Sequence, residues 1–224
     1  MIPLLLHIDT ATDIATVTIS EGEKVIGSVT NENQKEHASF LQAAIKNLLH
    51  QNDLTASHID AISVTAGPGS YTGLRVGIAS AKGLCYALDI PLIFLNTLEV
   101  IAASSIASNI ITDNNILFCA MIDARRQEVF TAVYDKDLNE ILPPCAMEIN
   151  AQSFKDFLAK NVIHFSGSGA KKASAIIVND QAKFENLNIL PAEIARMANL
   201  KFQNKTFIDV HFSDALYIKE FYIF

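Results

Sequence analysis

The sequence lacks long apolar runs. No stretch reaches the roughly 18 consecutive apolar residues that a membrane-spanning helix needs, although half of the 224 residues are hydrophobic. The apolar opening segment is interrupted by Asp9 and has neither a basic start nor a small-residue cleavage site. It therefore predicts a strand rather than a signal peptide, and we expect no membrane association.

Cysteine and positive charge are also scarce. The three cysteines are odd in number and scattered among apolar residues, which is typical of buried thiols in a reducing compartment, so we expect a cytoplasmic protein. The formal net charge of −7 argues against a broad electrostatic grip on nucleic acid by this chain alone. The charge does not exclude a function on RNA together with a basic partner protein.

Several catalytic signatures are missing. No two of the six histidines lie three or four residues apart, so no helix face carries a metal-binding histidine pair, and His-Glu-x-x-His is absent. The glycine-rich segment at 67–73 has neither the Gly-Lys-Ser/Thr ending of a P-loop nor the spacing Gly-x-Gly-x-x-Gly. It also lacks the lysine or second carboxylate that phosphoryl transfer needs. We predict no metal site and no catalytic residue in this chain acting alone.

That glycine-rich segment, GPGSYTG at 67–73, is nevertheless the most distinctive feature present. Three glycines in seven residues predict a sharp turn whose backbone comes close to another group, and Pro68 restricts the turn further. Thr72 is a candidate cap for a following helix, where exposed N–H groups would suit an anion.

Hydrophobic spacing predicts alternating strands and helices around this segment. Three short strands joined by turns too short for crossovers should be antiparallel; they are expected at 3–9, 14–20 and 24–30. Helical spacing and apolar runs predict the elements that follow: a helix at 36–51, a strand at 61–66, a helix at 72–88, a strand at 91–95 and a helix from about residue 97.

The pattern then restarts. FCAMID (118–123) repeats LLLHID (4–9), and SGSG (166–169) repeats the AGPG of 66–69. Two halves on one β-β-β-α-β-α-β plan indicate duplication, with chance similarity of apolar strands as the alternative. The expected division is an N-terminal subdomain at 1–108 and a smaller, degenerate C-terminal subdomain at 109–224. The segment 179–188 has no clear pattern.

This plan, with an aspartate closing the first strand of each half, resembles the actin, sugar-kinase and heat-shock-ATPase superfamily. It implies a duplicated ribonuclease-H-like α/β fold of mixed sheets with flanking helices. Five segments narrow the resemblance to the bacterial TsaB (YeaZ) family: IDTAT (8–12), EHAS (36–39), DAISV (60–64), GPGSYTGLRVG (67–77) and DARRQEVF (123–130). The likeness is thin beyond residue 135, and Tyr71, Phe130 and ALYIK (215–219) depart from the residues usual in the family.

The resemblance implies a role without catalysis. TsaB-like proteins are similar to the catalytic TsaD subunit but are held to lack its activity. They pair with it, and with the ATPase TsaE, to form threonylcarbamoyladenosine beside the anticodon of tRNA. This chain would then be a scaffold and activator, homodimeric when alone, that meets tRNA only through the complex. No tightly bound cofactor is expected, with ATP or ADP and magnesium at a subunit junction left open.

A first set of candidate residues would lie near a nucleotide or phosphate: Asp9, Thr10, Gly67, Gly69, Ser70, Thr72 and Gly73. By the resemblance, Asp9 would face Mg²⁺-phosphate in an active kinase of the superfamily, with Asp123 as its partner in the second half. The alternative is a carboxylate that caps a tight turn, which we favour for Asp123.

A second set would form a partner interface. The helix at 72–88 is apolar almost all round, which predicts a cover on its outer side, and the helix at 36–51 has a wide apolar face. Paired with the same helices of another chain, they would make a four-helix bundle; the alternative is cover by the second half of this chain. The predicted interface comprises Phe40, Leu41, Ala44, Ile45, Leu48, Leu74, Arg75, Ile78, Ala81 and Lys82.

Two enzyme classes remain as alternatives. A small actin-like-fold kinase would depend on Asp9, but the second half is short and no clear adenosine-binding segment is present. An M22-type metallopeptidase-like enzyme would need the zinc ligands that the histidine spacing does not provide.

Overall fold

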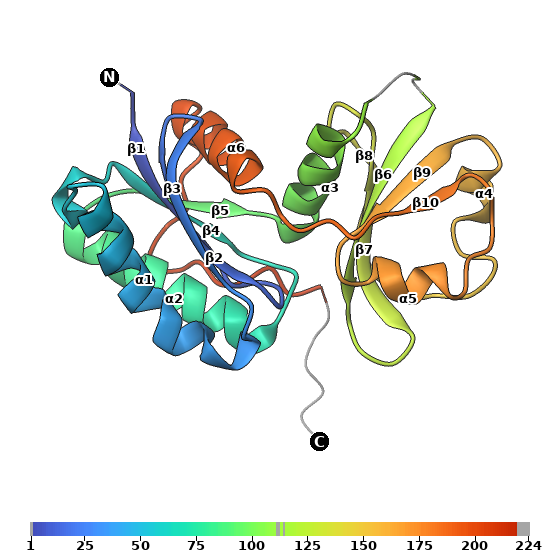
Figure 1. Ribbon diagram of the computed structural model, residues 1–224, viewed down its shortest axis with the longest axis horizontal. Helices are drawn as coiled ribbons and strands as arrows, with labels where there is room; N and C mark the ends of the chain where they lie inside the picture. Colours follow the sequence, from blue (N-terminus) through green and yellow to red (C-terminus); the bar gives the residue numbers. More distant parts are fainter. Residues whose placement is uncertain (1, 111–112, 114, 219–224) are drawn as a thin grey trace. The chain divides into compact units, whose positions relative to one another are not determined.

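The computed structural model describes residues 2–110, 113 and 115–218, and the chain divides into two compact units (Figure 1). Unit 1 comprises Met1–Thr97 and Pro191–Leu216, and unit 2 comprises Leu98–Leu190 and Tyr217–Phe224. Each unit is built on a five-stranded mixed sheet with flanking helices, so the predicted α/β fold is confirmed.

The sheet of unit 1 has the strand order β3-β2-β1-β4-β5. Its first three strands form the predicted antiparallel meander, and β4 and β5 run parallel to β1. The strands are β1 (Leu4–Asp9), β2 (Ala15–Glu21), β3 (Lys24–Asn31), β4 (Ala61–Thr65) and β5 (Leu92–Leu95). The helices are α1 (His37–Gln51), α2 (Tyr71–Leu88) and α6 (Pro191–Gln203), with 3₁₀ turns at Gln34–Glu36 and Ala56–His58.

The two faces of this sheet differ in chemistry. On β1, Leu6 and Ile8 pack into the hydrophobic core beneath α1 and α2. Because side chains alternate along a strand, His7 and Asp9 face the opposite side, and both are buried. That second face is covered by α6, which contacts β1, β2, β3 and β5. One face of the sheet is therefore apolar, and the other carries buried polar groups.

Unit 2 repeats the same plan. Its sheet has the order β10-β9-β6-β7-β8. Read from β8, this is the third, second, first, fourth and fifth strand of the repeat, as in unit 1, and the first three strands again pair antiparallel. The elements are α3 (Thr97–Ser108), β6 (Ile116–Asp123), β7 (Glu128–Tyr134), β8 (Glu140–Glu148), α4 (Lys155–Leu158), β9 (Val162–Ser166), α5 (Ala170–Ser174) and β10 (Ala182–Phe184). The predicted duplication is thus confirmed in topology, and the unassigned segment 179–188 contains β10.

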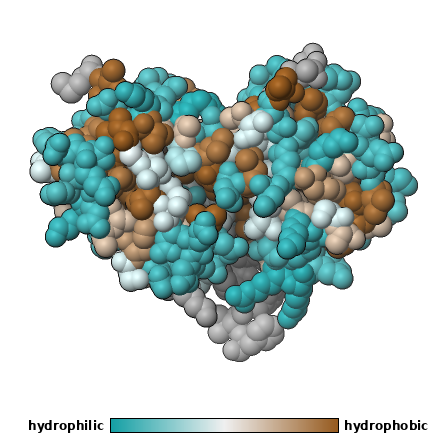
Figure 2. Space-filling view, viewed as in Figure 1, coloured by the Kyte–Doolittle hydropathy of each residue, from teal (hydrophilic) through white to brown (hydrophobic). Residues whose placement is uncertain are grey.

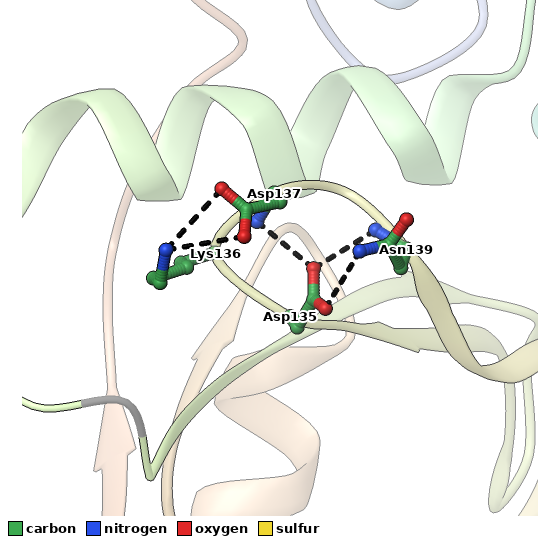
Figure 3. A network of polar contacts seen from close by, with 4 residues as sticks. All are labelled: Asp135, Lys136, Asp137 and Asn139. Atoms are coloured by element: carbon green, nitrogen blue, oxygen red, sulfur yellow. Dashed lines mark hydrogen bonds and ion pairs between the residues drawn. The ribbon is translucent and has the colours of Figure 1, made fainter.

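The turn between β7 and β8 is closed by one carboxylate (Figure 3). Asp135 Oδ1 accepts hydrogen bonds from the backbone N–H groups of Asp137 and Asn139, each at 2.9 Å, and Oδ2 accepts one from Asn139 Nδ2. Desolvation alone would raise the pKa of Asp135, but these hydrogen bonds and nearby Lys136 outweigh it and lower that pKa. The turn is therefore held by charge-assisted bonds on the surface.

The division into units differs from the predicted one at residue 108. Helix α3 belongs to unit 2, where Leu98, Ile101 and Ala102 pack against the sheet, and residues 191–216 return to unit 1. Since α3 is buried on almost every side, its sequence pattern does not indicate which sheet it joins.

Helix α3 is tied to its own sheet by Glu185, which follows β10. The carboxylate accepts hydrogen bonds from Ser105 Oγ of α3 (2.7 Å) and from Nδ2 of Asn109, the residue after α3 (2.8 Å). It also pairs with His164 Nδ1 of β9 (2.5 Å). Desolvation would raise the pKa of Glu185, but the hydrogen bonds outweigh it and hold that pKa below its usual value. The carboxylate is therefore ionised at neutral pH.

The cysteines agree in part with the expectation of buried thiols. Cys85 and Cys119 are buried and free, and burial raises the pKa of each to about 12, so both are unreactive. Cys145 is half-buried. Among the described residues, no helix combines the length and apolar character that would let it span a bilayer.

Candidate functional site

The glycine loop between β4 and α2 packs against the chain's own backbone. A Cβ atom built at Gly69 or Gly73 would lie less than 3.0 Å from the carbonyl oxygens of Ala11 and Thr10, in the turn after β1. At Gly67, which has φ +120°, it would lie 2.6 Å from the carbonyl oxygen of Leu216. These glycines are required because the loop, the β1–β2 turn and the C-terminal segment meet there without space for side chains.

The donors of this loop are engaged internally. The backbone N–H of Ser70 donates to the Ala11 carbonyl oxygen (2.7 Å), and the N–H of Gly73 donates to Ser70 Oγ (3.3 Å). Ser70 is therefore the N-cap of α2, and the predicted cap, Thr72, is exposed on the first turn. The sequence pattern missed the cap because the helix begins at Tyr71, one residue earlier than its spacing indicates.

Asp9 is 2% exposed and is bound within unit 1. Its Oδ1 accepts hydrogen bonds from Thr65 Oγ1 (2.6 Å) and from the N–H of Ala11 (3.1 Å). Desolvation raises the pKa of Asp9, and these two hydrogen bonds and His37 oppose that rise. Thr10 is buried beside it and donates from Oγ1 to the Gly73 carbonyl oxygen (2.7 Å). The geometry matches a carboxylate that caps a turn.

Asp9 and Asp123 do not occupy equivalent positions in the two repeats. Ile8 packs on the α1–α2 side of its sheet, which places Asp9 on the α6 side. In unit 2, Ile122 packs on the α3 side, so Asp123 lies on the α5 side. Because α3 and α6 each follow the last strand of a repeat, the two carboxylates occupy non-equivalent faces.

Asp123 itself caps a turn, as favoured from the sequence. Its Oδ1 accepts a hydrogen bond from the N–H of Arg125 (2.7 Å) and forms an ion pair with Lys172 Nζ of α5 (2.6 Å). The described residues contain no group of three or more His, Cys, Asp or Glu side chains that could hold a metal ion.

A buried histidine network lies on the polar face of sheet 1 and was not singled out from the sequence. His7 is 1% exposed and bridges Ser63 Oγ (2.7 Å, from Nδ1) and Ser20 Oγ (2.8 Å, from Nε2). Desolvation lowers the pKa of His7 to about 3, so the ring is neutral. The available signal was the polar residue between Leu6 and Ile8 in a strand buried on both faces.

We expect His7 to make the stability of unit 1 fall in acid. Its folded pKa of about 3 lies below its unfolded value of 6.5, so the unfolded chain binds more protons between those values. Stability is therefore lost as the pH falls below 6.5, by about 1.4 kcal/mol per pH unit for one group. In a His7→Gln variant, the loss in unfolding free energy between pH 6.5 and 5.0, measured with urea, should be smaller by about 2 kcal/mol.

The control for this prediction is His50→Gln, on the exposed side of α1. It should leave the pH dependence unchanged. Asp9 has a raised pKa and acts in the opposite direction, but it is present in every variant and cancels in the comparison. An equal loss in His7→Gln and the unaltered chain would contradict the prediction.

The predicted interface residues on α1 and α2 lie mainly in the core of unit 1. Leu41, Ala44, Ile45, Leu48, Leu74, Ile78 and Ala81 are each at most 6% exposed. Phe40 and Lys82 are half-buried, with Lys82 Nζ donating to the Ser213 carbonyl oxygen (2.9 Å). Arg75 is exposed and lies over the Tyr71 ring at 4.1 Å. Helical spacing thus identified the inner face of these helices instead of the outer one.

The outer face of α2 carries a different set of residues. We define it by its exposed small residues Ala79, Gly83 and Ala87; the other exposed residues of the helix are Tyr71, Thr72, Arg75 and Tyr86. A Cβ atom at Gly83 would meet nothing within 4 Å, unlike one at Gly73 or Gly77. Where α1 and α2 lie at the lower left of Figure 1, the surface in Figure 2 is mainly teal, white and pale brown. At Ala79, Gly83 and Ala87 the exposed side of α2 therefore presents no long side chain.

Comparison with known proteins identifies relatives of the whole fold. The profile of a family described as TsaD, tRNA N6-adenosine threonylcarbamoyltransferase, matches residues 13–198. The tRNA threonylcarbamoyladenosine biosynthesis protein TsaB of Bacillus subtilis is 32% identical over 130 residues, 58% of this chain and 54% of that relative. The matched segment thus spans little more than half the length of the first curated relatives.

Solved structures agree with the fold. A protein of Pseudomonas aeruginosa described as similar to the peptidase YEAZ has a TM-score of 0.83 at 20% identity, covering 97% of this chain and 100% of its own. An inorganic polyphosphate/ATP-glucomannokinase of Arthrobacter has a TM-score of 0.50 at 11% identity, covering 90% of this chain and 99% of its own. The fold is therefore of the actin and sugar-kinase type.

Proposed function

We propose that this chain, which belongs to the TsaD family and, within it, to the TsaB (YeaZ) group, is a non-catalytic, cytoplasmic subunit that activates threonylcarbamoyladenosine formation in tRNA. The observation that supports this most directly is the packing of the glycine loop. The carbonyl oxygens of Thr10, Ala11 and Leu216 lie directly against its glycines, so the loop packs on the chain's own backbone. Catalysis would then belong to a TsaD-like partner, with a TsaE-like ATPase as the third component and tRNA bound only through the complex.

Unit 1 by itself does not fit a tightly bound nucleotide. The carboxylate of Asp9 is held by Thr65 and Ala11. The N–H of Ser70 donates to the Ala11 carbonyl oxygen, and the N–H of Gly73 donates to Ser70 Oγ. We therefore propose that ATP or ADP with magnesium binds only at a junction with a partner, which supplies further groups. Titration of the isolated chain with a fluorescent ATP analogue should show no saturable binding at micromolar concentrations.

Reconstitution tests the proposal. The reaction would contain the TsaD-type and TsaE-type proteins of the same organism, threonylcarbamoyl-AMP and a tRNA that reads ANN codons. Modified tRNA should form only when this chain is added. The chain alone should neither hydrolyse ATP nor modify tRNA. ATP hydrolysis that Asp9→Asn abolishes would favour a kinase, and tight zinc binding would favour a peptidase; either result would overturn the proposal.

We place the partner surface, for self-pairing and for the TsaD-like subunit, on the outer face of α2. Glycine inside a helix costs up to ~1 kcal/mol relative to alanine. At Gly73 and Gly77 this cost is explained by the close approach of Thr10, which leaves no space for a side chain. A Cβ atom built at Gly83 would meet nothing within 4 Å among the described residues. A backbone from another chain packing at Gly83 would supply the missing reason, as small residues do at close helix crossings.

A charge on this face tests its role. Ala79→Glu should keep the native circular dichroism spectrum, because Ala79 is exposed. In sedimentation it should weaken self-association about tenfold or more, and modification in the reconstituted system should fall with it. Ala151→Glu, the same change at an exposed turn of unit 2, is the control and should leave both unchanged. Association that survives Ala79→Glu would place the surface elsewhere.

A further inference from the structure

The C-terminal segment 207–216, called here the strap, is fixed along the edge of unit 1. It leaves α6 as the red coil of Figure 1. The N–H of Ile208 donates to the Leu92 carbonyl oxygen of β5 (2.8 Å), and the N–H of Leu216 donates to that of Ala66 (2.7 Å). Between them, Lys82 of α2 donates to the Ser213 carbonyl oxygen (2.9 Å). The strap is therefore a held element and crosses beside α2.

Exposed aromatic side chains meet where the strap passes α2. Phe212 is 90% exposed and Tyr86 is 72% exposed. His211 connects them, with ring centroids 5.9 Å from Tyr86 and 6.3 Å from Phe212. Asp209 Oδ1 accepts hydrogen bonds from the N–H groups of His211 (2.7 Å) and Phe212 (3.4 Å), which fixes the turn. We name Tyr86, His211 and Phe212 the aromatic patch.

An aromatic patch held in this way has the composition of an interface centre. Exposed rings gathered at one place mark interaction sites more often than apolar residues scattered singly, and buried aromatic anchors dominate binding in protein interfaces. Tyr86 lies one helical turn from Gly83, so the patch adjoins the outer face of α2. The patch therefore extends the surface already assigned to a partner.

The charges around the patch indicate what kind of partner fits. Asp89 at the end of α2, and Asp209 and Asp214 in the strap, are all exposed. The cation beside them, Lys82, is hydrogen-bonded to the strap backbone. If two copies of this chain paired patch to patch, these carboxylates would face one another, which disfavours self-pairing. A surface with lysine or arginine around an apolar pocket would be complementary.

We propose that the aromatic patch docks a second, different protein that inserts Phe212 into an apolar pocket rimmed by basic residues. This inference rests on the proposed function, because it names the contact that a subunit of the complex would make. It separates two adjoining uses of α2, since the outer face serves close helix packing and the aromatic patch selects a heterologous partner.

The test measures binding of the unaltered chain and of Phe212→Ala to the purified TsaD-type protein and, separately, to the TsaE-type protein, by calorimetry. Phe212→Ala should weaken binding to one of them about tenfold or more. Self-association in sedimentation should stay unchanged, and the fold should survive because the side chain is exposed. Val178→Ala, at a 93% exposed apolar residue of unit 2, is the matched control and should change neither.

The outcomes separate the two proposals. If the unaltered chain binds neither protein, both proposals fall. If it binds but Phe212→Ala binds equally well, only the aromatic patch is overturned. If Phe212→Ala weakens self-association instead, the occupant is a second copy and the proposal is wrong. A slower association for Asp214→Asn, most marked at low salt, would support the basic rim.

Discussion

Replacing Gly73 by alanine should destabilise unit 1 by about 3 kcal/mol or more, whereas the same replacement at Gly83 of the same helix should stabilise it by up to ~1 kcal/mol. A methyl group at Gly73 would lie within 3.0 Å of the Thr10 carbonyl oxygen. That oxygen belongs to backbone, and the turn cannot retreat easily because Thr10 Oγ1 also donates to the Gly73 carbonyl oxygen (2.7 Å).

Gly83 is the internal control for this experiment. An added methyl group there meets open space, so only the gain in helix propensity remains. Urea unfolding followed by circular dichroism would measure both variants against the unaltered chain. If Gly73→Ala were as stable as Gly83→Ala, the loop would not be packed as described. A Gly83→Ala variant that is more stable but self-associates less would link the glycine to its partner.

Ala81→Glu should unfold unit 1, and Ala79→Glu should not. Ala81 lies on the buried side of α2, in the core of unit 1, so a glutamate there would place an unpaired charge among apolar side chains. We expect a loss on the order of 4 kcal/mol or more. Ala79 lies two positions away on the exposed side, where the same charge stays in water.

Circular dichroism and a urea titration distinguish the two variants directly. Ala81→Glu should lose its cooperative transition or shift it to much lower urea, and Ala79→Glu should follow the unaltered chain within about 0.5 kcal/mol. A native transition in Ala81→Glu would mean that α2 is turned differently. Loss of association in Ala81→Glu alone would be no evidence for an interface, since the unit that forms it would be missing.

The order and type of the elements were predictable from the sequence because each repeat alternates cleanly between strand and helix patterns. The bounds of the first three strands and of α2 agree with expectation to within about two residues. The glycine segment also predicted that another group would lie close to its backbone. That group is the chain's own backbone at Thr10, Ala11 and Leu216. Nothing in the local sequence signals Leu216, which is brought there by tertiary packing.

The site was less predictable than the fold. Helical spacing shows that Leu41, Ile45 and Leu48 share a face, but the same pattern describes a face that meets a sheet and one that meets a partner. The repeated aspartates were also misleading, since Ile8 packs toward α1 and α2 but Ile122 packs toward α3, which leaves the two aspartates on non-equivalent faces of their sheets. His7 was missed because a single histidine in a strand becomes informative only when Ser20 and Ser63 are seen beside it.

The return of α6 to unit 1 has a consequence for biosynthesis. The helix covers the polar face of sheet 1, but it is made after every strand of unit 2. While the ribosome adds residues 98–190, the His7 network of the nascent chain has no lid, and water can reach the imidazole and the serines. Unit 1 can therefore complete its folding only after α6 has been translated, and a chain that stops before Pro191 would expose that face to proteases and chaperones.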